Sequence, residues 1–178
     1  MATAHADSWQ EQPFTLEYHH NETKHRYTPD VLVSWRAIQE VVEIKDDQDA
    51  ESTENRERFA LIGELLAEHG YRFRVWKRSE ICAEPRLTNS NLVLRYRCVA
   101  LQAAERERIR RAFSSTTELP LDKLCEISEA PVQSVLRLVL DGAIHINWWE
   151  PLCLESTVST APVGRQIWPC TSEEITCC

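Results

Sequence analysis

The sequence predicts an α/β protein followed by a small helical unit that carries a hairpin. Short apolar runs separated by turn residues fill roughly the first 45 positions, and an amphipathic helical pattern and a further strand-like run come after them. Helical spacing returns beyond the Ser/Thr stretch at 114–117 and ends in another pair of short apolar runs. Strands that alternate with helices are typical of an α/β core, and the later helices indicate a second, smaller unit.

The expected elements of the first part are, in order, strands at 9–18, 26–34 and 37–45, a loop at 46–55, a helix at 56–69, strands at 71–76 and near 79–82, and one or two helices within 92–113. In the first helix, Phe59, Ile62, Leu65 and Leu66 recur at helical spacing and are expected to face the sheet. Gly70 follows as a C-terminal cap. This order places one helix between two strands of a single sheet.

The expected second part begins after a linker at 114–117. Its elements are a helix from Leu119, a second helix from about Ser128 that stops at Asp141-Gly142, a strand at 143–147 and another near Leu152. A helix, a turn, a helix and a hairpin describe a winged-helix-like unit. Only Arg137 is a basic residue central to the second helix, so we expect protein docking or a structural role more than base readout.

Composition narrows the class of protein. The chain has 178 residues, 43% hydrophobic, and only four glycines, which predicts one ordinary domain or a compact domain with a small companion. No apolar run approaches a membrane span and no secretory signal precedes the first strand, so we expect a cytoplasmic protein without membrane contact. The seven cysteines lack paired C-x-x-C spacing, which favours free thiols over zinc.

The candidate catalytic residues are Asp30, Glu43 and Lys45. Asp30 follows a proline and leads into an apolar run, and Glu43 and Lys45 lie thirteen and fifteen residues further along the chain, at the end of the next run. Side chains alternate faces along a strand, so Glu43 and Lys45 point the same way. If the two runs pair as a hairpin, all three side chains meet at one end of it.

Two carboxylates and an ammonium at one point suit phosphodiester cleavage. Carboxylates hold Mg²⁺, which keeps waters for chemistry, and a lysine can assist the water or neutralise charge on phosphorus. The alternative interpretation puts Asp30 in an ordinary turn and makes Glu43 and Lys45 a solvated pair on an exposed strand.

The motifs resemble the PD-(D/E)xK nuclease core, and in particular the TnsA-type endonuclease subunit of heteromeric transposases. The resemblance spans about residues 9 to 158 and rests on order as well as on single motifs. The motifs that carry it are Gln12-Pro13 before an extended run, Tyr27-Thr28-Pro29-Asp30, Glu43-Ile44-Lys45, the strand Tyr71-Arg72-Phe73-Arg74-Val75, and Pro85-Arg86-Leu87-Thr88-Asn89.

The resemblance implies a restriction-endonuclease-like mixed sheet with flanking helices at 9–113 and a winged-helix-like domain at 118–158. Two prolines and several Ser and Thr residues predict a flexible tail at 159–178. It also implies that Asp30, Glu43 and the carbonyl of Ile44 hold Mg²⁺, for which Mn²⁺ can substitute, and that Lys45 assists the water. The implied function is cutting of transposon 5′ ends, together with a DDE transposase and an ATPase regulator.

One departure from the family pattern bears on activity. TnsA-like proteins usually carry a helix before the first strand that supplies another glutamate, and only eleven residues precede Gln12. Two other interpretations therefore stay open: a catalytically impaired scaffold or binding subunit, and a defence or restriction nuclease on the same fold.

The distribution of charge predicts the DNA-facing surface. The net charge is −8, yet residues 71–111 contain eleven Arg or Lys and four acids, a net of +7, which leaves −15 for the rest. A basic segment on an acidic protein is a candidate phosphate-facing surface, and Lys77, Arg78 and Arg86 are its candidate DNA contacts. The acids at 46–57 flank the predicted metal site and would repel DNA.

Overall fold

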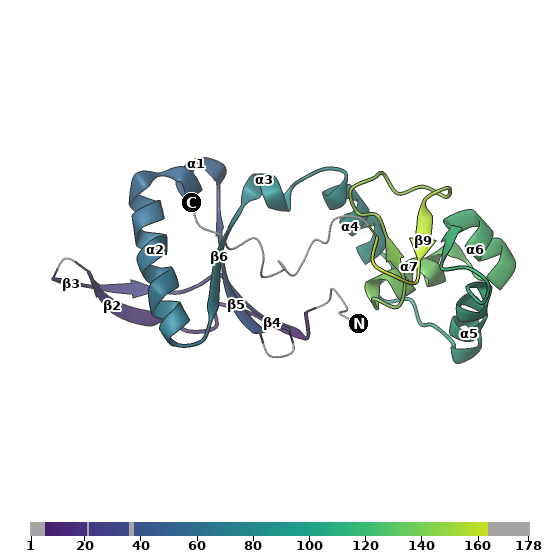
Figure 1. Ribbon diagram of the computed structural model, residues 1–178, viewed down its shortest axis with the longest axis horizontal. Helices are drawn as coiled ribbons and strands as arrows, with labels where there is room; N and C mark the ends of the chain where they lie inside the picture. Colours follow the sequence, from purple (N-terminus) through teal and green to yellow (C-terminus); the bar gives the residue numbers. More distant parts are fainter. Residues whose placement is uncertain (1–5, 21, 36–37, 164–178) are drawn as a thin grey trace. The chain divides into compact units, whose positions relative to one another are not determined.

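The computed structural model describes residues 6–20, 22–35 and 38–163 (Figure 1). These residues form two compact units that divide between Cys82 and Ala83. We call residues 6–82 the N-terminal unit and residues 83–163 the C-terminal unit. The division falls before the stretch at 114–117 that the sequence suggested as a linker.

The N-terminal unit is a mixed α/β structure. Its strands are β1 (Ser8–Glu11), β2 (Leu16–His20), β3 (Thr23–Tyr27), β4 (Val31–Trp35), β5 (Ile38–Lys45) and β6 (Arg72–Lys77). Its helices are α1 (Asp47–Glu51), α2 (Thr53–Glu68) and α3 (Arg78–Ile81). The predicted α/β class is confirmed.

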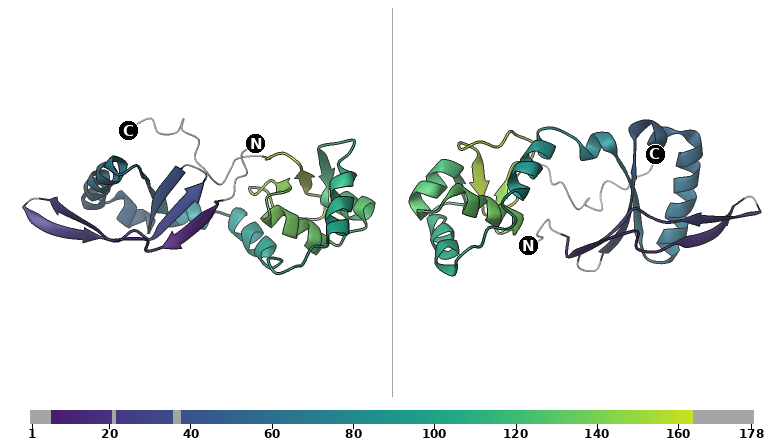
Figure 2. Two further views of the ribbon diagram at one scale, coloured as in Figure 1. Left: turned by 90° about the horizontal axis from the view of Figure 1, so that it is seen from below. Right: turned by 180° about the vertical axis from the view of Figure 1, so that it is seen from behind.

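A four-stranded mixed sheet in the order β1-β4-β5-β6 organises this unit. β4 pairs antiparallel with β1 and β5, whereas β5 and β6 are parallel and are connected through α1 and α2. β5 is an interior strand, and Val41 and Val42, which point to opposite faces of the sheet, are both buried. β2 and β3 form a separate antiparallel hairpin that extends beyond this sheet (Figure 2).

The core of the N-terminal unit lies between the sheet and α2, which runs along one face (Figure 1). Phe59, Ile62 and Leu66 supply the buried stripe of α2, as their helical spacing predicts. Ser52 caps the start of the helix by accepting a hydrogen bond from the Asn55 amide. At the other end Gly70 has a φ of 82°, which confirms its predicted role in terminating the helix.

Backbone chemistry divides two of the expected strands. The run at 9–18 becomes β1 and β2, because Gln12 adopts a φ of 44° and Pro13 has no amide hydrogen to donate to a ladder. The run at 26–34 likewise becomes β3 and β4 on either side of Thr28-Pro29-Asp30. Residues 46–55 contain α1 and the start of α2 instead of a loop, and residues 79–82 lie in and just after α3 instead of a strand.

The C-terminal unit packs helices against a small sheet. Its helices are α4 (Arg86–Leu94), α5 (Ala103–Ala112), α6 (Leu121–Ser128) and α7 (Val132–Leu140). Its strands are β7 (Glu118–Pro120), β8 (His145–Ile146) and β9 (Thr157–Ser159), antiparallel in the order β7-β9-β8.

One hydrophobic core explains why this unit begins at residue 83. Val93 of α4 and Ile109 of α5 are buried in the same cluster as Leu124, Val135 and the other core residues of the later helices. The two helices that we expected to end the first domain therefore belong to the second core. The last strand is β9, later in the chain than the strand expected near Leu152, and residues 164–178 of the predicted tail lie outside the described residues.

Candidate active site

The pairing of β4 with β5 brings Asp30 beside the end of β5. Val31 is the register partner of Val42, so the next step of the same register sets Asp30 level with Glu43. The Ile44 amide donates a hydrogen bond of 2.7 Å to Asp30 Oδ2. The backbone carbonyl of Asp30 in turn accepts from the Gln12 amide at 3.0 Å, which anchors the residue on its other side.

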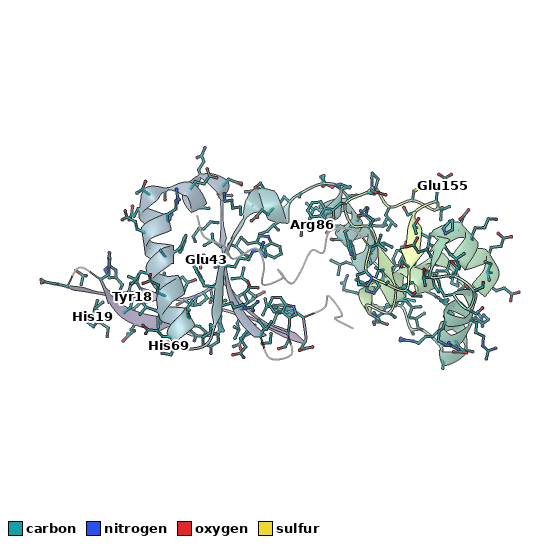
Figure 3. The ribbon with its side chains drawn as sticks, viewed as in Figure 1. Tyr18, His19, Glu43, His69, Arg86 and Glu155 are labelled. Atoms are coloured by element: carbon teal, nitrogen blue, oxygen red, sulfur yellow. The ribbon has the colours of Figure 1, made fainter. Side chains whose placement is uncertain are left out.

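Glu43 is an acid placed in an interior strand, and only 5% of it is exposed (Figure 3). Its Oε2 accepts a hydrogen bond of 2.9 Å from the Tyr27 hydroxyl. Its Oε1 lies 2.7 Å from Lys45 Nζ. Both carboxylate oxygens therefore have a partner, which offsets the cost of burying the charge.

Lys45 points to the same side of β5 as Glu43, as strand alternation predicts. Its side chain is 30% exposed, so the ammonium group lies where the buried carboxylate meets solvent. The structure thus brings Asp30, Glu43 and Lys45 together at one end of the β4–β5 pair. This geometry excludes the alternative of a fully solvated Glu43–Lys45 pair, because Glu43 is buried.

Tyr27 is the residue of this site that the sequence interpretation missed. Burial, followed by the charges of Glu43 and Asp30, raises the pKa of the Tyr27 hydroxyl far above its usual range. The phenol therefore keeps its proton and donates a hydrogen bond to Glu43. The sequence did carry a signal, since Tyr27 precedes Asp30 by only three residues.

The oxygen ligands available here suit a hard divalent cation. Asp30 uses one carboxylate oxygen on the Ile44 amide, and within the described part of the chain Oδ1 has no hydrogen-bond partner. Glu43 Oε1 and the carbonyl of Ile44, a residue that is 43% exposed, complete a set of oxygen donors that Mg²⁺ prefers. Across residues 6–20, 22–35 and 38–163, no cluster of three or more His, Cys, Asp or Glu side chains could hold a metal ion.

The candidate DNA contacts Lys77 and Arg78 both lie at the end of β6, beside α1. Lys77 Nζ lies 2.8 Å from Glu51 Oε1, and Arg78 Nη1 lies 3.4 Å from Asp46 Oδ1. The hydrogen bond and charge of Glu51 raise the pKa of the Lys77 ammonium. Acids that we expected to repel DNA are thus partly neutralised by the bases next to them.

Arg86 is placed differently from the other two. It lies in the C-terminal unit at the start of α4 (Figure 3), is only 7% exposed, and its guanidinium carbon is 5.5 Å from the centre of the Trp149 ring. That burial argues against the phosphate contact suggested by the sequence, because a phosphate needs an accessible cation. A cation over an aromatic face stabilises the packing of its own unit.

The arginines of α5 also have local partners. Arg110 and Arg111 both bind Glu107, at 2.7 and 2.8 Å, and Arg106 lies 3.1 Å from Asp141. Arg108 donates to the carbonyl oxygens of Ser128 and Glu129 at the end of α6. Many basic side chains of segment 71–111 are therefore paired with acids or carbonyl oxygens of the protein itself. The net charge of +7 overstates the positive surface that is available to a ligand.

The fold and the site together indicate a class of protein domain. An acid at the start of one strand and an acid and a lysine at the end of its antiparallel neighbour, with a helix leading to a parallel strand, are compatible with a nuclease-like α/β domain. Residues 4–78 match the family model described as the TnsA-like endonuclease N terminal. This match supports a TnsA-like endonuclease domain in the N-terminal unit, which suggests nuclease activity. No curated protein matches the chain.

In the described part of the chain, no helix combines the length and the apolar character that crossing a membrane requires.

Proposed function

We propose that this chain is a metal-dependent DNA endonuclease subunit that cuts transposon 5′ ends together with a DDE transposase. The observation that carries the proposal is the linked set of Asp30, Glu43 and Lys45 on two adjacent strands, within a segment that matches TnsA-like endonucleases. The same set is the basis for proposing a PD-(D/E)xK core in the N-terminal unit.

In this proposal Asp30, Glu43 and the carbonyl of Ile44 hold Mg²⁺. The bound ion polarises the phosphate and lowers the pKa of a bound water. Asp30 is oriented for binding by the Ile44 amide, which fixes one of its oxygens. Glu43 offers Oε1, the oxygen that Lys45 holds in the free protein.

Lys45 has two parts in the reaction. In the free protein its ammonium group neutralises Glu43 at the position where a cation would bind. With a cation held beside Glu43, the Lys45 ammonium group, which is partly exposed, would turn toward the attacking water or the scissile phosphate. There it donates a hydrogen bond and stabilises negative charge that develops on the phosphate oxygens.

For the C-terminal unit we propose a winged-helix-like fold that docks protein partners. Support for the fold comes from the order of the elements that follow α4, which are α5, β7, α6, α7, β8 and β9, with the sheet order β7-β9-β8. Support for docking comes from α7, the helix that would enter a groove of DNA. Five of its nine residues are buried and Arg137 is paired with Asp141, so few side chains remain to read bases. The transposase and an ATPase regulator are the proposed partners.

A metal-dependent nicking assay tests the nuclease proposal. The full chain, alone and with its transposase, is incubated with supercoiled plasmid that carries the transposon ends, in Mg²⁺ or Mn²⁺. We expect metal-dependent nicks at the 5′ ends that Asp30→Asn abolishes. Asp49→Asn, which removes an exposed acid of α1, is the matched control and should cleave like the wild type.

The outcomes separate the proposals. Absence of cleavage by the wild type with either metal and with the transposase would contradict the nuclease proposal and favour a binding subunit. Metal-dependent cleavage that shows no preference for transposon ends would favour a defence or restriction nuclease. Equal cleavage by the wild type and Asp30→Asn would remove Asp30 from the site.

A further inference from the structure

We propose that Tyr27 is a positioning residue that fixes the Glu43 carboxylate so that only Oε1 is available to the metal. The inference rests on the proposed function and adds a fourth residue to its site. Tyr27 has no place among the predicted metal ligands or catalytic residues, and it is only 3% exposed, so it acts through Glu43 and not on the substrate.

The Tyr27 hydroxyl is held in place by the packing of its ring. Tyr27 belongs to the core cluster between the sheet and α2. Its ring meets the edge of Phe73 at 6.4 Å between centroids, and the Arg58 guanidinium carbon lies 5.9 Å from its centre. A ring confined in this way can aim its hydroxyl in one direction only, and that direction is Glu43 Oε2.

The hydrogen bond restricts the carboxylate. The terminal torsion of a glutamate is broad, so an unrestrained carboxylate can exchange its two oxygens. With Oε2 held by Tyr27 at 2.9 Å, Oε1 alone faces Lys45 Nζ at 2.7 Å. The metal and Lys45 then compete for one defined oxygen, which fixes the direction from which the cation is bound.

Without the hydroxyl, Glu43 keeps its charge but loses this orientation. The carboxylate can then rotate and offer both oxygens to Lys45, which strengthens the state that competes with metal. Hydrogen bonds to ligating carboxylates typically change metal affinity or activity by about 10- to 100-fold when they are removed. We therefore expect Tyr27→Phe to weaken metal binding by about tenfold or more.

The experiment measures metal binding directly, apart from any cleavage. The full chain is titrated with Mn²⁺ and the free ion is followed by electron paramagnetic resonance, for the wild type, Tyr27→Phe, Tyr18→Phe and Asp30→Asn. Tyr18 is the matched control, because it is a buried tyrosine of the same core cluster whose ring stacks on His25 and has no link to Glu43. Tyr18→Phe should leave the Mn²⁺ affinity unchanged.

A double-mutant cycle tests whether Tyr27 acts through Glu43. In a Glu43→Ala background, Tyr27→Phe should cause no further loss of the residual Mn²⁺ affinity, because the group that it orients is gone. All affinities are compared at a temperature at which circular dichroism shows every variant folded, so a merely structural loss of stability does not alter the result.

The inference and the proposed function fail in different ways. If Asp30→Asn abolishes Mn²⁺ binding while Tyr27→Phe binds like the wild type, the Tyr27 inference is overturned and the metal site stands. A further loss in the Glu43→Ala background equal to that in the wild type also overturns it. If Asp30→Asn binds Mn²⁺ like the wild type, the proposed metal site itself is wrong.

Discussion

The N-terminal and C-terminal units bury polar side chains for different purposes. In the N-terminal unit, the Glu43 carboxylate accepts a hydrogen bond from the Tyr27 hydroxyl and is neutralised by the Lys45 ammonium. In the C-terminal unit, the buried Asn89 is satisfied by the backbone alone. It donates to the carbonyls of Trp148 and Glu150 and accepts from the Leu152 amide.

This difference shows which buried polar group is available for chemistry. Backbone partners cannot leave, so Asn89 joins the segment that contains residues 148–152 to α4 and stabilises one conformation. The Lys45 side chain is partly exposed and can move, so the charge of Glu43 can pass from an ammonium partner to another cation. A buried acid with a mobile cationic partner indicates function, whereas a buried amide on the backbone indicates folding.

Lys45→Met tests the functional half of this comparison and has the largest expected effect. It keeps the aliphatic stem and removes the charge that the proposal places on the phosphate. We expect the nicking rate to fall by about 10²- to 10³-fold, the usual cost of losing one such donor. The rate is measured with the full chain under saturating metal and DNA.

The matched control is Lys24→Met. It also breaks a lysine–glutamate pair with an N–O distance of 2.7 Å, the pair with Glu17, but both partners there are exposed. Nicking by Lys24→Met should equal that of the wild type. If both variants lose activity to the same degree, Lys45 has no special role and the comparison between the units breaks down.

The sequence was sufficient to predict the parts of the fold that depend on local pattern. Helical spacing identified α2, Gly70 identified its end, and strand alternation placed Glu43 and Lys45 on the same face. Asp30 could be expected beside Glu43 because a short connection between two apolar runs favours a hairpin. Each of these features depends on residues close together in the chain.

The parts that could not be predicted depend on long-range packing. The contact between Tyr27 and Glu43 spans sixteen residues, and those of Asn89 with 148–152 span about sixty. The same limit applies to Arg86, since its contact with the Trp149 ring joins residues that are far apart in the chain.

Asn89→Ala tests the structural half of the comparison. The change leaves two carbonyls and one amide without their partner in a site where Asn89 is only 2% exposed. Unsatisfied buried groups cost about 1–3 kcal/mol each, and partial hydration reduces the sum, so we expect a loss of about 3 kcal/mol in the free energy of unfolding. Urea denaturation followed by circular dichroism measures it.

Asn91→Ala is the control, because Asn91 lies on the same helix and is exposed. It should change the free energy of unfolding by less than about 0.5 kcal/mol. An effect of Asn89→Ala no larger than that of Asn91→Ala would show that the contacts to residues 148–152 do not stabilise the unit.

Arg108→Met tests whether an arginine of the basic helix α5 stabilises the fold. Arg108 Nε donates at 2.9 Å to the carbonyl of Ser128, and Nη2 at 3.3 Å to that of Glu129, where α6 ends. A cation at a helix C-terminus is favourable, and we expect its removal to cost about 1 kcal/mol. Arg110→Met, which loses only an exposed pair with Glu107, should cost less in the same urea titration. The reverse order would mean that the pairs along α5 matter more than the cap.

Glu107 gives the smallest expected effect, a dependence of stability on acid pH. Hydrogen bonds from Arg110 and then Arg111 lower the pKa of the Glu107 carboxyl from an ordinary 4.5 to about 2. The unfolded chain therefore takes up this proton at a higher pH than the folded chain, so the contribution to stability is present above about 4.5 and is lost as the pH falls toward about 2. Because the pair faces solvent, the contribution is small.

Glu107→Gln should reduce the difference between urea midpoints measured at about pH 6 and about pH 3. Glu105→Gln, on the same helix, leaves both arginine pairs in place and should not reduce this difference. An identical pH dependence of stability in the wild type and Glu107→Gln would mean that the arginine pairs do not measurably lower the pKa of the Glu107 carboxyl. Arg110 and Arg111 would then be available as part of a positive surface.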